Sequence, residues 1–263
     1  MKPETVKAKK RLGQHFLTDL SIAQAIADAL PPHTRRVLEV GPGMGVLTRF
    51  LLQHPEWEVH AVELDEESVR YLHRHFPELQ DRLHAMDFLK ADLPVLLPAP
   101  FAVIGNFPYN ISSQILFRIL DHKDLIPDVV GMFQKEVAVR IASGPGNKDY
   151  GILSVLLQAF YDIEYLFTVS EQVFDPPPKV KSAVIRLRRN SRSSLPCDEA
   201  LWKRVVKTAF NQRRKTLHNS LKSFAFPESV QADPIFRKRP EALSVEDFVW
   251  LTQQVMDEKP ESW

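Results

Sequence analysis

The chain has 263 residues, 44% of them hydrophobic and 25% charged, a composition typical of a globular protein with one large domain or two smaller ones. The single cysteine, Cys197, excludes an internal disulfide, and no apolar run reaches 18 residues, so we expect no membrane span. The basic N-terminal residues lead into Leu12-Gly13-Gln14-His15 rather than an apolar core, so we expect no secretory signal and a cytoplasmic protein.

Charge is strongly segregated along the chain, although the net charge is only +1. Residues 37–175 carry 10 Lys/Arg against 20 Asp/Glu, whereas residues 176–240 carry 16 against 4. An acidic body flanked by basic segments favours a polyanionic partner, with a merely solvated charged face as the alternative. The basic residues 1–11 are expected to be mobile until such a partner binds them.

The first predicted helix follows Asp19 or Ser21 and places Ile22, Ile26 and Leu30 on one face before two prolines end it. From residue 37 onward, strands and helices alternate. Strands are expected at 37–41, 58–63, 82–86, 101–105 and 129–133, and helices at 45–53, 66–76, 112–121 and 135–143. This order predicts an α/β fold with a largely parallel sheet. Two further strands are expected at 163–169 and 182–187.

Three alternate glycines, Gly41, Gly43 and Gly45, separate the first strand from the helix that follows it. Glycine lets the chain turn sharply and lets a ligand approach bare backbone, and the helix would aim its free N–H groups at that ligand. Glu63 closes the next strand, about 20 residues later, where an acidic side chain can hold a ribose hydroxyl pair. Glu63 therefore favours a nucleoside-containing cofactor over an ordinary Gly-rich turn. Because no phosphate-binding G-x-x-x-x-G-K-[ST] motif is present, we expect that cofactor to carry something other than a triphosphate.

Polar residues follow three strands: Glu63, Asp87 and Asn106. In open parallel sheets, ligands bind beyond the carboxyl ends of the strands, so these residues form a coherent predicted site. In Asn106-Phe107-Pro108-Tyr109, the proline biases Phe107 towards an extended backbone and can leave its carbonyl beside the Asn106 oxygen. Two acceptors next to an aromatic face suit an exocyclic amino group on a planar base, whereas the alternative is a simple helix cap.

The triple proline 176–178 forms a stiff loop that could present Phe174 as a second stacking face or act only as a rigid connector. His73 and His75 lie on different faces of their helix, and with a single cysteine in the chain no metal site is predicted.

After the basic residues 186–192 the pattern becomes wholly helical. Trp202, Val206 and Phe210 belong to one apolar face, and Arg213-Arg214-Lys215 follow it. We therefore expect residues 1–190 to form a cofactor-binding domain and residues 191–263 a small helical domain with a basic surface. Residues 241–263 should supply a closing helix and a frayed tail.

Together these motifs resemble the KsgA-type S-adenosylmethionine-dependent rRNA adenine dimethyltransferases over essentially the whole chain. The resemblance rests on residues 13–17, 39–45, Glu63, Asp87, 106–109, 174–180 and 210–221. It implies a Rossmann-like class I methyltransferase domain with a seven-stranded mixed sheet and a small all-α C-terminal domain. It also implies N6,N6-dimethylation of two adjacent adenines in a hairpin loop near the 3′ end of small-subunit rRNA. The protein is then expected to act as a monomer on an immature subunit.

The resemblance also implies residue roles. The cofactor S-adenosylmethionine would be contacted by His15, Leu17, Gly41, Glu63, Asp87 and Asn106, with Gly43, Leu64 and Phe88 beside them. The target base would meet Asn106, Phe107, Pro108, Tyr109 and Phe174, and RNA would meet Lys9, Lys10, Arg11, Lys179, Arg213, Arg214 and Lys215. Position 15 departs from the family, which commonly has Asn there.

Two alternatives remain at this level. The Erm-type enzymes share most of these motifs and methylate large-subunit rRNA, although the Phe174 loop and the Arg213-Arg214-Lys215 segment favour the small-subunit branch. A non-catalytic RNA-binding assembly or transcription factor with the same fold is the second alternative. The intact Glu63, Asp87 and 106–109 motif argue against it.

Overall fold

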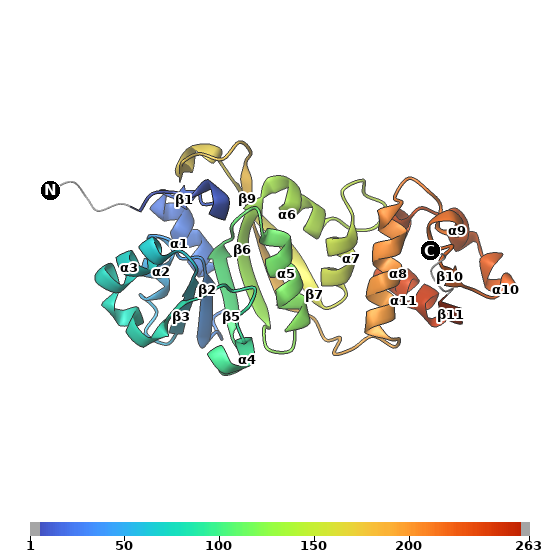
Figure 1. Ribbon diagram of the computed structural model, residues 1–263, viewed down its shortest axis with the longest axis horizontal. Coiled ribbons are helices and arrows are strands. Elements are labelled where there is room, and N and C mark those ends of the chain that lie inside the picture. Colours follow the sequence, from blue (N-terminus) through green and yellow to red (C-terminus); the bar gives the residue numbers. More distant parts are fainter. Residues whose placement is uncertain (1–5, 259–263) are drawn as a thin grey trace. The chain divides into compact units, whose positions relative to one another are not determined.

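A computed structural model describes residues 6–258 and divides the chain into two compact units (Figure 1). The first unit contains the residues up to Ala138 together with Asp162–Arg189, and the second contains Val139–Tyr161 together with the residues from Asn190 on. Within the described part of the chain, no helix combines the length and the apolar character that crossing a membrane requires.

The first unit is built on a seven-stranded sheet. Its strand order is β4 (Leu83–Ala85), β3 (Glu58–Glu63), β2 (Arg36–Val40), β5 (Ala102–Asn106), β6 (Asp128–Gln134), β9 (Ser182–Arg189) and β7 (Tyr161–Val169). The pairs from β4 to β6 are parallel, and β9 runs antiparallel to β6. The predicted mixed α/β sheet is therefore confirmed. Because the chain order reverses between β2 and β5, the carboxyl ends of these two strands open a crevice for a ligand.

Helices flank this sheet. They are α1 (Leu20–Asp28), α2 (Thr48–Leu51), α3 (Glu66–His75), α4 (Leu93–Leu96), α5 (Ser112–Asp121) and the start of α6 (Lys135–Ala142). Asp19 caps α1 as predicted, since its carboxylate accepts hydrogen bonds from the Ser21 and Ile22 N–H groups. Ala23 and Ile26 of α1 are buried in the core, where α1 packs against α2 and β6.

Helix α2 is much shorter than the predicted 45–53. Gly45 has φ 74°, which an α-helix does not allow, so regular helix begins only at Thr48. The chain between Gly41 and Thr48 therefore forms a compact set of turns. Because α2 is only about one turn long, its dipole contributes less to ligand binding than the predicted longer helix would.

The N-terminal residues that the structure describes pack against the first unit. Residues 1–5, including Lys2, lie outside the described residues. Val6 is buried, Lys10–Leu12 form a 3₁₀ turn, and β1 (Phe16–Leu17) pairs antiparallel with β8 (Phe174–Asp175). These contacts place residues 6–17 against the first unit, and the mobility expected of residues 1–11 stays a prediction.

The second unit is mainly helical. It contains α7 (Ile152–Gln158), α8 (Glu199–Asn211), α9 (Leu217–Ser220), α10 (Glu228–Gln231) and α11 (Val245–Gln253), with 3₁₀ turns at Pro234–Arg237 and Pro240–Ala242. Residues 139–161, placed by sequence in the first domain, belong here because α7 packs against α8 and α11. The expected all-α character is wrong in one detail: β10 (Phe224–Ala225) pairs with β11 (Asp257–Glu258). The predicted closing helix is α11.

Candidate functional site

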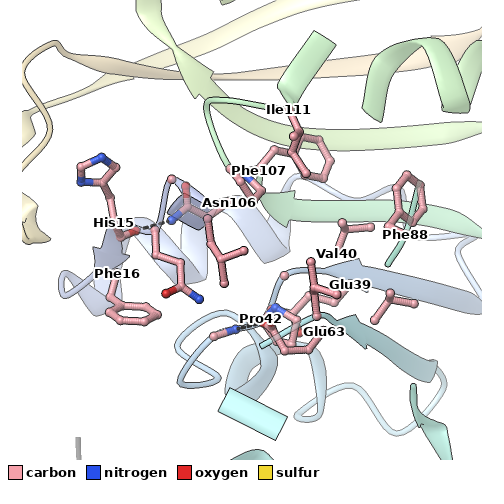
Figure 2. A pocket seen from close by; sticks show the side chains of 18 of the residues that line it. His15, Phe16, Glu39, Val40, Pro42, Glu63, Phe88, Asn106, Phe107 and Ile111 are labelled. Atoms are coloured by element: carbon pink, nitrogen blue, oxygen red, sulfur yellow. Dashed lines mark hydrogen bonds between the residues drawn. The ribbon is translucent and has the colours of Figure 1, made fainter. Parts of the chain in front are cut away.

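A pocket opens at the carboxyl ends of β2, β3 and β5, and Figure 2 shows its lining. One side, here called the glycine-loop half, contains the turns after β2 together with Glu63 and Asp87. The other, the Asn106 half, contains residues 106–109 and the segment around His15. Of the predicted cofactor and target-base residues, those that line the pocket are His15, Leu17, Gly41, Gly43, Glu63, Leu64, Asp87, Phe88, Asn106, Phe107, Pro108 and Tyr109.

The glycine loop has the backbone that its sequence predicts. Gly41, Gly43 and Gly45 have φ of 71°, 58° and 74°, all in the left-handed region that favours glycine. A side chain at Gly43 would also place its Cβ 2.8 Å from Cε1 of Phe16. The Gly43 N–H is not free for a ligand, however, because it donates to Oε2 of Glu63 over 3.0 Å. This bond ties the loop to the end of β3.

Glu63 is 5% exposed and accepts a second hydrogen bond, from the Asp65 N–H to its Oε1 over 2.8 Å. Burial raises the pKa of Glu63, and the two backbone N–H groups partly offset that rise. Each carboxylate oxygen can accept more than one hydrogen bond, so both remain able to receive hydroxyl groups. The carboxylate is thus oriented by main chain, as a rigid bidentate acceptor requires.

The same half contains a second buried acid, which the sequence patterns did not predict. Glu39, on β2, is 1% exposed and lines the pocket, and its Oε2 accepts a hydrogen bond from Oγ1 of Thr48 over 2.6 Å. Burial raises the pKa of Glu39 to about 8, and the charge of nearby Glu63 acts in the same direction. Glu39 is therefore protonated at neutral pH and behaves as a polar packing group. Its place in a strand-like run gave no signal of this.

Asp87 lies two residues beyond β4 and is half-buried, with Oδ1 accepting the Leu89 N–H over 2.9 Å. Two apolar side chains beside it are unusually exposed for their type, Leu64 at 54% and Met86 at 38%. Both line the pocket. A pocket that holds a carboxylate and two exposed apolar side chains suits a flat heterocycle that carries an amino group.

In the Asn106 half, the side-chain amide of Asn106 has a fixed orientation. Its Nδ2 donates to the main-chain carbonyl of His15 over 2.9 Å, a bond drawn in Figure 2. The donor side of the amide is therefore used, and Oδ1 is left as an acceptor.

The Phe107 ring anchors this loop. It is fully buried, and it packs over Gly105 and Gly131, which face each other across β5 and β6. It also meets Phe133 edge-on, with ring centroids 5.2 Å apart. The ring cannot stack on a ligand, so it is the Phe107 main chain that faces the site.

Two contacts fix the Tyr109 side chain, one at its hydroxyl and one at its ring. Its hydroxyl is hydrogen-bonded to Oγ of Ser182, a buried residue on β9, and the ring stacks on His15 with centroids 5.4 Å apart. Burial raises the pKa of Tyr109, so the phenol stays protonated. Tyr109 is a neutral, fixed aromatic wall.

Phe174 is not brought to the pocket. It is 4% exposed, belongs to the core, and pairs with Leu17 through β8 and β1. The prediction that it forms a second stacking face is not supported by this packing, because its ring has no face open to a ligand. The triple-proline loop instead fits the alternative of a rigid connector.

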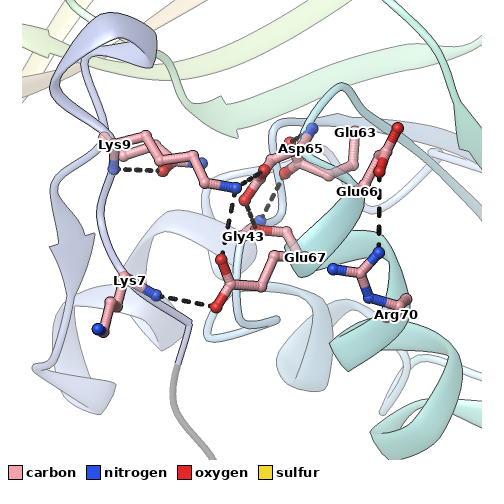
Figure 3. Close-up of polar contacts among 10 residues, drawn as sticks. Lys7, Lys9, Gly43, Glu63, Asp65, Glu66, Glu67 and Arg70 are labelled. Atoms are coloured by element: carbon pink, nitrogen blue, oxygen red, sulfur yellow. Dashed lines mark hydrogen bonds and ion pairs between the residues drawn. The ribbon is translucent and has the colours of Figure 1, made fainter.

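Lys9 is engaged within the first unit rather than presented to a partner. Figure 3 shows its ammonium bonded to the Asp65 carboxylate, with Oε2 of Glu67 3.4 Å away. Burial tends to raise the pKa of Asp65, but the bonds from Lys9 and Ser68 outweigh it and hold that pKa low. The pair fixes the N-terminal segment beside the loop that carries Glu63. Lys10, Arg11 and Lys179 are exposed.

In the second unit, Arg214 and Lys215 are exposed, whereas Arg213 is half-buried and donates to the main-chain carbonyl of Lys148. The Leu217 N–H donates to the Lys238 carbonyl over 2.9 Å, which places the exposed residues 237–239 beside this segment. Sequence reasoning did not assign Arg237-Lys238-Arg239 a role, although their composition was the available signal.

Among residues 6–258, no group of three or more His, Cys, Asp or Glu side chains is arranged to hold a metal ion.

Comparison with known proteins gives a consistent result. A family model described as ribosomal RNA adenine dimethylase matches residues 5–245. Ribosomal RNA small subunit methyltransferase A of Parabacteroides distasonis is 64% identical over 249 residues, covering 94% of this chain and 93% of the relative. The protein of the same name from Cytophaga hutchinsonii is 59% identical, with coverage of 96% and 98%.

The chain is also similar to solved structures. A dimethyladenosine transferase from Plasmodium falciparum has a TM-score of 0.73 at 26% identity, covering 90% of this chain and 96% of that one. The 23S rRNA methyltransferase ErmE has a TM-score of 0.65 at 27% identity, with coverage of 91% and 100%.

Proposed function

Since the chain belongs to the ribosomal RNA adenine dimethylase family, we propose that it dimethylates two adjacent adenines in the 3′-terminal hairpin loop of small-subunit rRNA. Like its family, the protein is an S-adenosylmethionine-dependent methyltransferase. The small-subunit assignment is supported by relatives at 59–64% identity that bear that name, against 27% for the large-subunit enzyme ErmE. We extend the proposal to a monomer acting in the cytoplasm on an immature subunit.

The glycine-loop half fits the cofactor. Gly41 has open space where a side chain would stand, with only Pro108 near, at 3.9 Å, so a ligand can lie against its backbone. The buried Glu63 carboxylate would accept the ribose hydroxyls, and Asp87 would accept from the adenine amino group, with the exposed Leu64 and Met86 in the same pocket as apolar surface for the ring. S-adenosylmethionine would supply an electrophilic methyl group to this pocket.

The observation that carries the proposal is the orientation of Asn106. Because Nδ2 is committed to the His15 carbonyl, Oδ1 is available to accept an N–H of the target amine, and the Phe107 carbonyl stands next to it in the chain. The N6 amine of adenine is a poor nucleophile, since its lone pair is delocalised into the ring. Two acceptors on its hydrogens draw that lone pair out of the ring plane and stabilise the positive charge that develops on N6.

In each methyl transfer, the N6 lone pair forms the new N–CH₃ bond, and the electrons of the breaking S–CH₃ bond pass to sulfur. The methylated N6 is then acidic enough to lose its proton to water without a strong base. Tyr109 would stack on the extruded base, a contact worth about 1–3 kcal/mol. After the first transfer one N–H remains, so rotation about C6–N6 can present it again and give the dimethyl product.

Methylation of isolated subunits tests the proposal. Small subunits that lack the modification should acquire N6,N6-dimethyladenosine at two adjacent positions, located by nuclease digestion and mass spectrometry. Large-subunit RNA should remain unmodified under the same conditions. Modification of large-subunit RNA alone would favour the Erm-type activity, and RNA binding without methyl transfer would favour the non-catalytic alternative.

A further inference from the structure

His15 occupies a position that the resemblance assigns to cofactor contact, but its side chain is directed elsewhere. In Figure 2 the imidazole lies on the far side of the pocket from Glu63. Its Nδ1 donates to the main-chain carbonyl of Pro176 over 2.8 Å, and the ring stacks on Tyr109 at an interplanar angle of 29°. Both contacts belong to the Asn106 half.

The main chain of His15 contacts the same half. Its carbonyl accepts the Asn106 Nδ2, so one residue touches the amide that would hold the target amine and the aromatic ring that would stack on the base. The Pro176 carbonyl that it binds follows β8, the partner strand of β1, which begins immediately after His15. His15 therefore joins three segments that are distant in sequence: residues 13–17, 106–109 and 174–178.

We propose that His15 is a positioning residue for the target adenine: its imidazole fixes Tyr109 and the 174–178 loop, while its carbonyl fixes the Asn106 amide. This inference rests on the proposed function of the site. The imidazole then helps to position the adenine that accepts the methyl group, and it does not contribute to cofactor affinity.

The two imidazole contacts can be removed separately. His15→Asn keeps an N–H donor for Pro176 but loses the aromatic face, His15→Phe keeps the face but loses the donor, and His15→Ala loses both. Since a single hydrogen bond and a single ring contact each contribute modestly, each partial variant should lower the methyl-transfer rate by about three- to tenfold. His15→Ala should lower it by about ten- to hundredfold.

The chain supplies a matched control. His75, at the end of α3, makes the same pair of contacts, because its Nδ1 bonds to the Tyr71 carbonyl over 2.9 Å and its ring stacks on Tyr71 at 4.0 Å. It is exposed and does not line the pocket. His75→Ala should leave the methyl-transfer rate unchanged, so it separates positioning from a general loss of stability.

The test is single-turnover methyl transfer to unmodified small subunits at saturating cofactor, with cofactor affinity measured by calorimetry on each variant. We expect the methyl-transfer rate to be highest for the wild-type enzyme, lower for the Asn and Phe variants, and lowest for His15→Ala. The cofactor Kd should change by less than about threefold in every variant. Monomethyladenosine should accumulate in the slower variants. A cofactor Kd raised about tenfold with a normal saturated rate would overturn the proposal, as would normal values of both. If His15→Ala does not fold, the Asn and Phe variants decide. A wild-type enzyme inactive on small subunits would instead refute the proposed function.

Discussion

The two halves of the pocket are built by different means. In the glycine-loop half, backbone conformation and buried carboxyl groups fix the geometry. The Gly43 N–H donates to the Glu63 carboxylate, and the raised pKa of Glu39 keeps that carboxyl protonated at neutral pH. In the Asn106 half, the polar groups are fixed by contacts between distant segments, as when the His15 carbonyl holds Asn106. The first half should therefore respond to changes in charge and pH, and the second to losses of packing and orientation.

The largest effect expected from this difference is on stability. The raised pKa of Glu39 means that the folded state keeps a proton that the unfolded chain loses. This group's contribution is therefore fully present below pH 4.5 and is lost as pH rises towards about 8. Glu39→Gln, which keeps an oxygen for Thr48, should remove this loss and be more stable than wild type by roughly 4 kcal/mol at pH 8. Urea unfolding at several pH values measures the difference, and parallel curves for the two proteins would contradict the buried-acid description.

Removing Glu63 should break the glycine-loop half selectively. Glu63→Ala deletes the carboxylate and leaves the N–H groups of Gly43 and Asp65 without their acceptor. We expect cofactor affinity to fall by about 1.5–3 kcal/mol, the range for hydrogen bonds to a charged group, with a comparable loss for Asp87→Ala. Calorimetry checks this, and Glu66→Ala, on the exposed start of α3, is the control. Unchanged cofactor binding in both variants would exclude these two residues as ligands.

Tyr109 tests the other half. Tyr109→Ala should lose about 1–2 kcal/mol of transition-state stabilisation, seen as a lower single-turnover rate, because the stacking face is lost. Cofactor affinity should be retained. Tyr109→Phe keeps the ring and loses only the bond to Ser182, so its rate should be close to wild type. Equal losses in the two variants would show that the hydroxyl, not the ring, matters.

The smallest effect concerns neither half of the pocket. RNA binding should weaken with salt because Lys and Arg contacts to phosphate release counterions. Neutralising Arg213, Arg214 and Lys215 together should lower the salt slope by about 2 rather than 3, since Arg213 already donates to the Lys148 carbonyl. Cofactor affinity should not change. An unaltered slope would mean that this surface does not contact RNA.

Sequence reasoning worked best where one residue determines its own geometry. The G-x-G-x-G spacing predicted a turn, and Gly41, Gly43 and Gly45 all have positive φ. The placement of Glu63, Asp87 and Asn106 at the ends of parallel strands followed from the βαβ pattern alone. Such features depend on the conformational preferences of single residues and on the spacing of apolar residues along the chain, and both can be read from one sequence.

What could not be predicted depends on segments far apart in the chain. The pairing of β1 with β8 joins Leu17 to Phe174, and this pairing buries the phenylalanine that we expected at the pocket. The ion pair of Lys9 with Asp65 is equally non-local, and it engages within the first unit a lysine for which sequence predicted an RNA contact. Helix α7 was missed because Ile152–Gln158 is nearly all apolar and shows no helical period.

Methyl transfer by Asn106→Ala tests the central claim most directly. Under single-turnover conditions on unmodified small subunits, the loss of the Oδ1 acceptor should lower the rate by about 10²–10³-fold while RNA binding is retained. Asn106→Asp keeps an acceptor but loses the N–H that bonds to the His15 carbonyl. Its rate should therefore lie between those of the wild-type enzyme and Asn106→Ala. A near-normal rate for Asn106→Ala would contradict the account, since it would mean that the target amine is held by other groups.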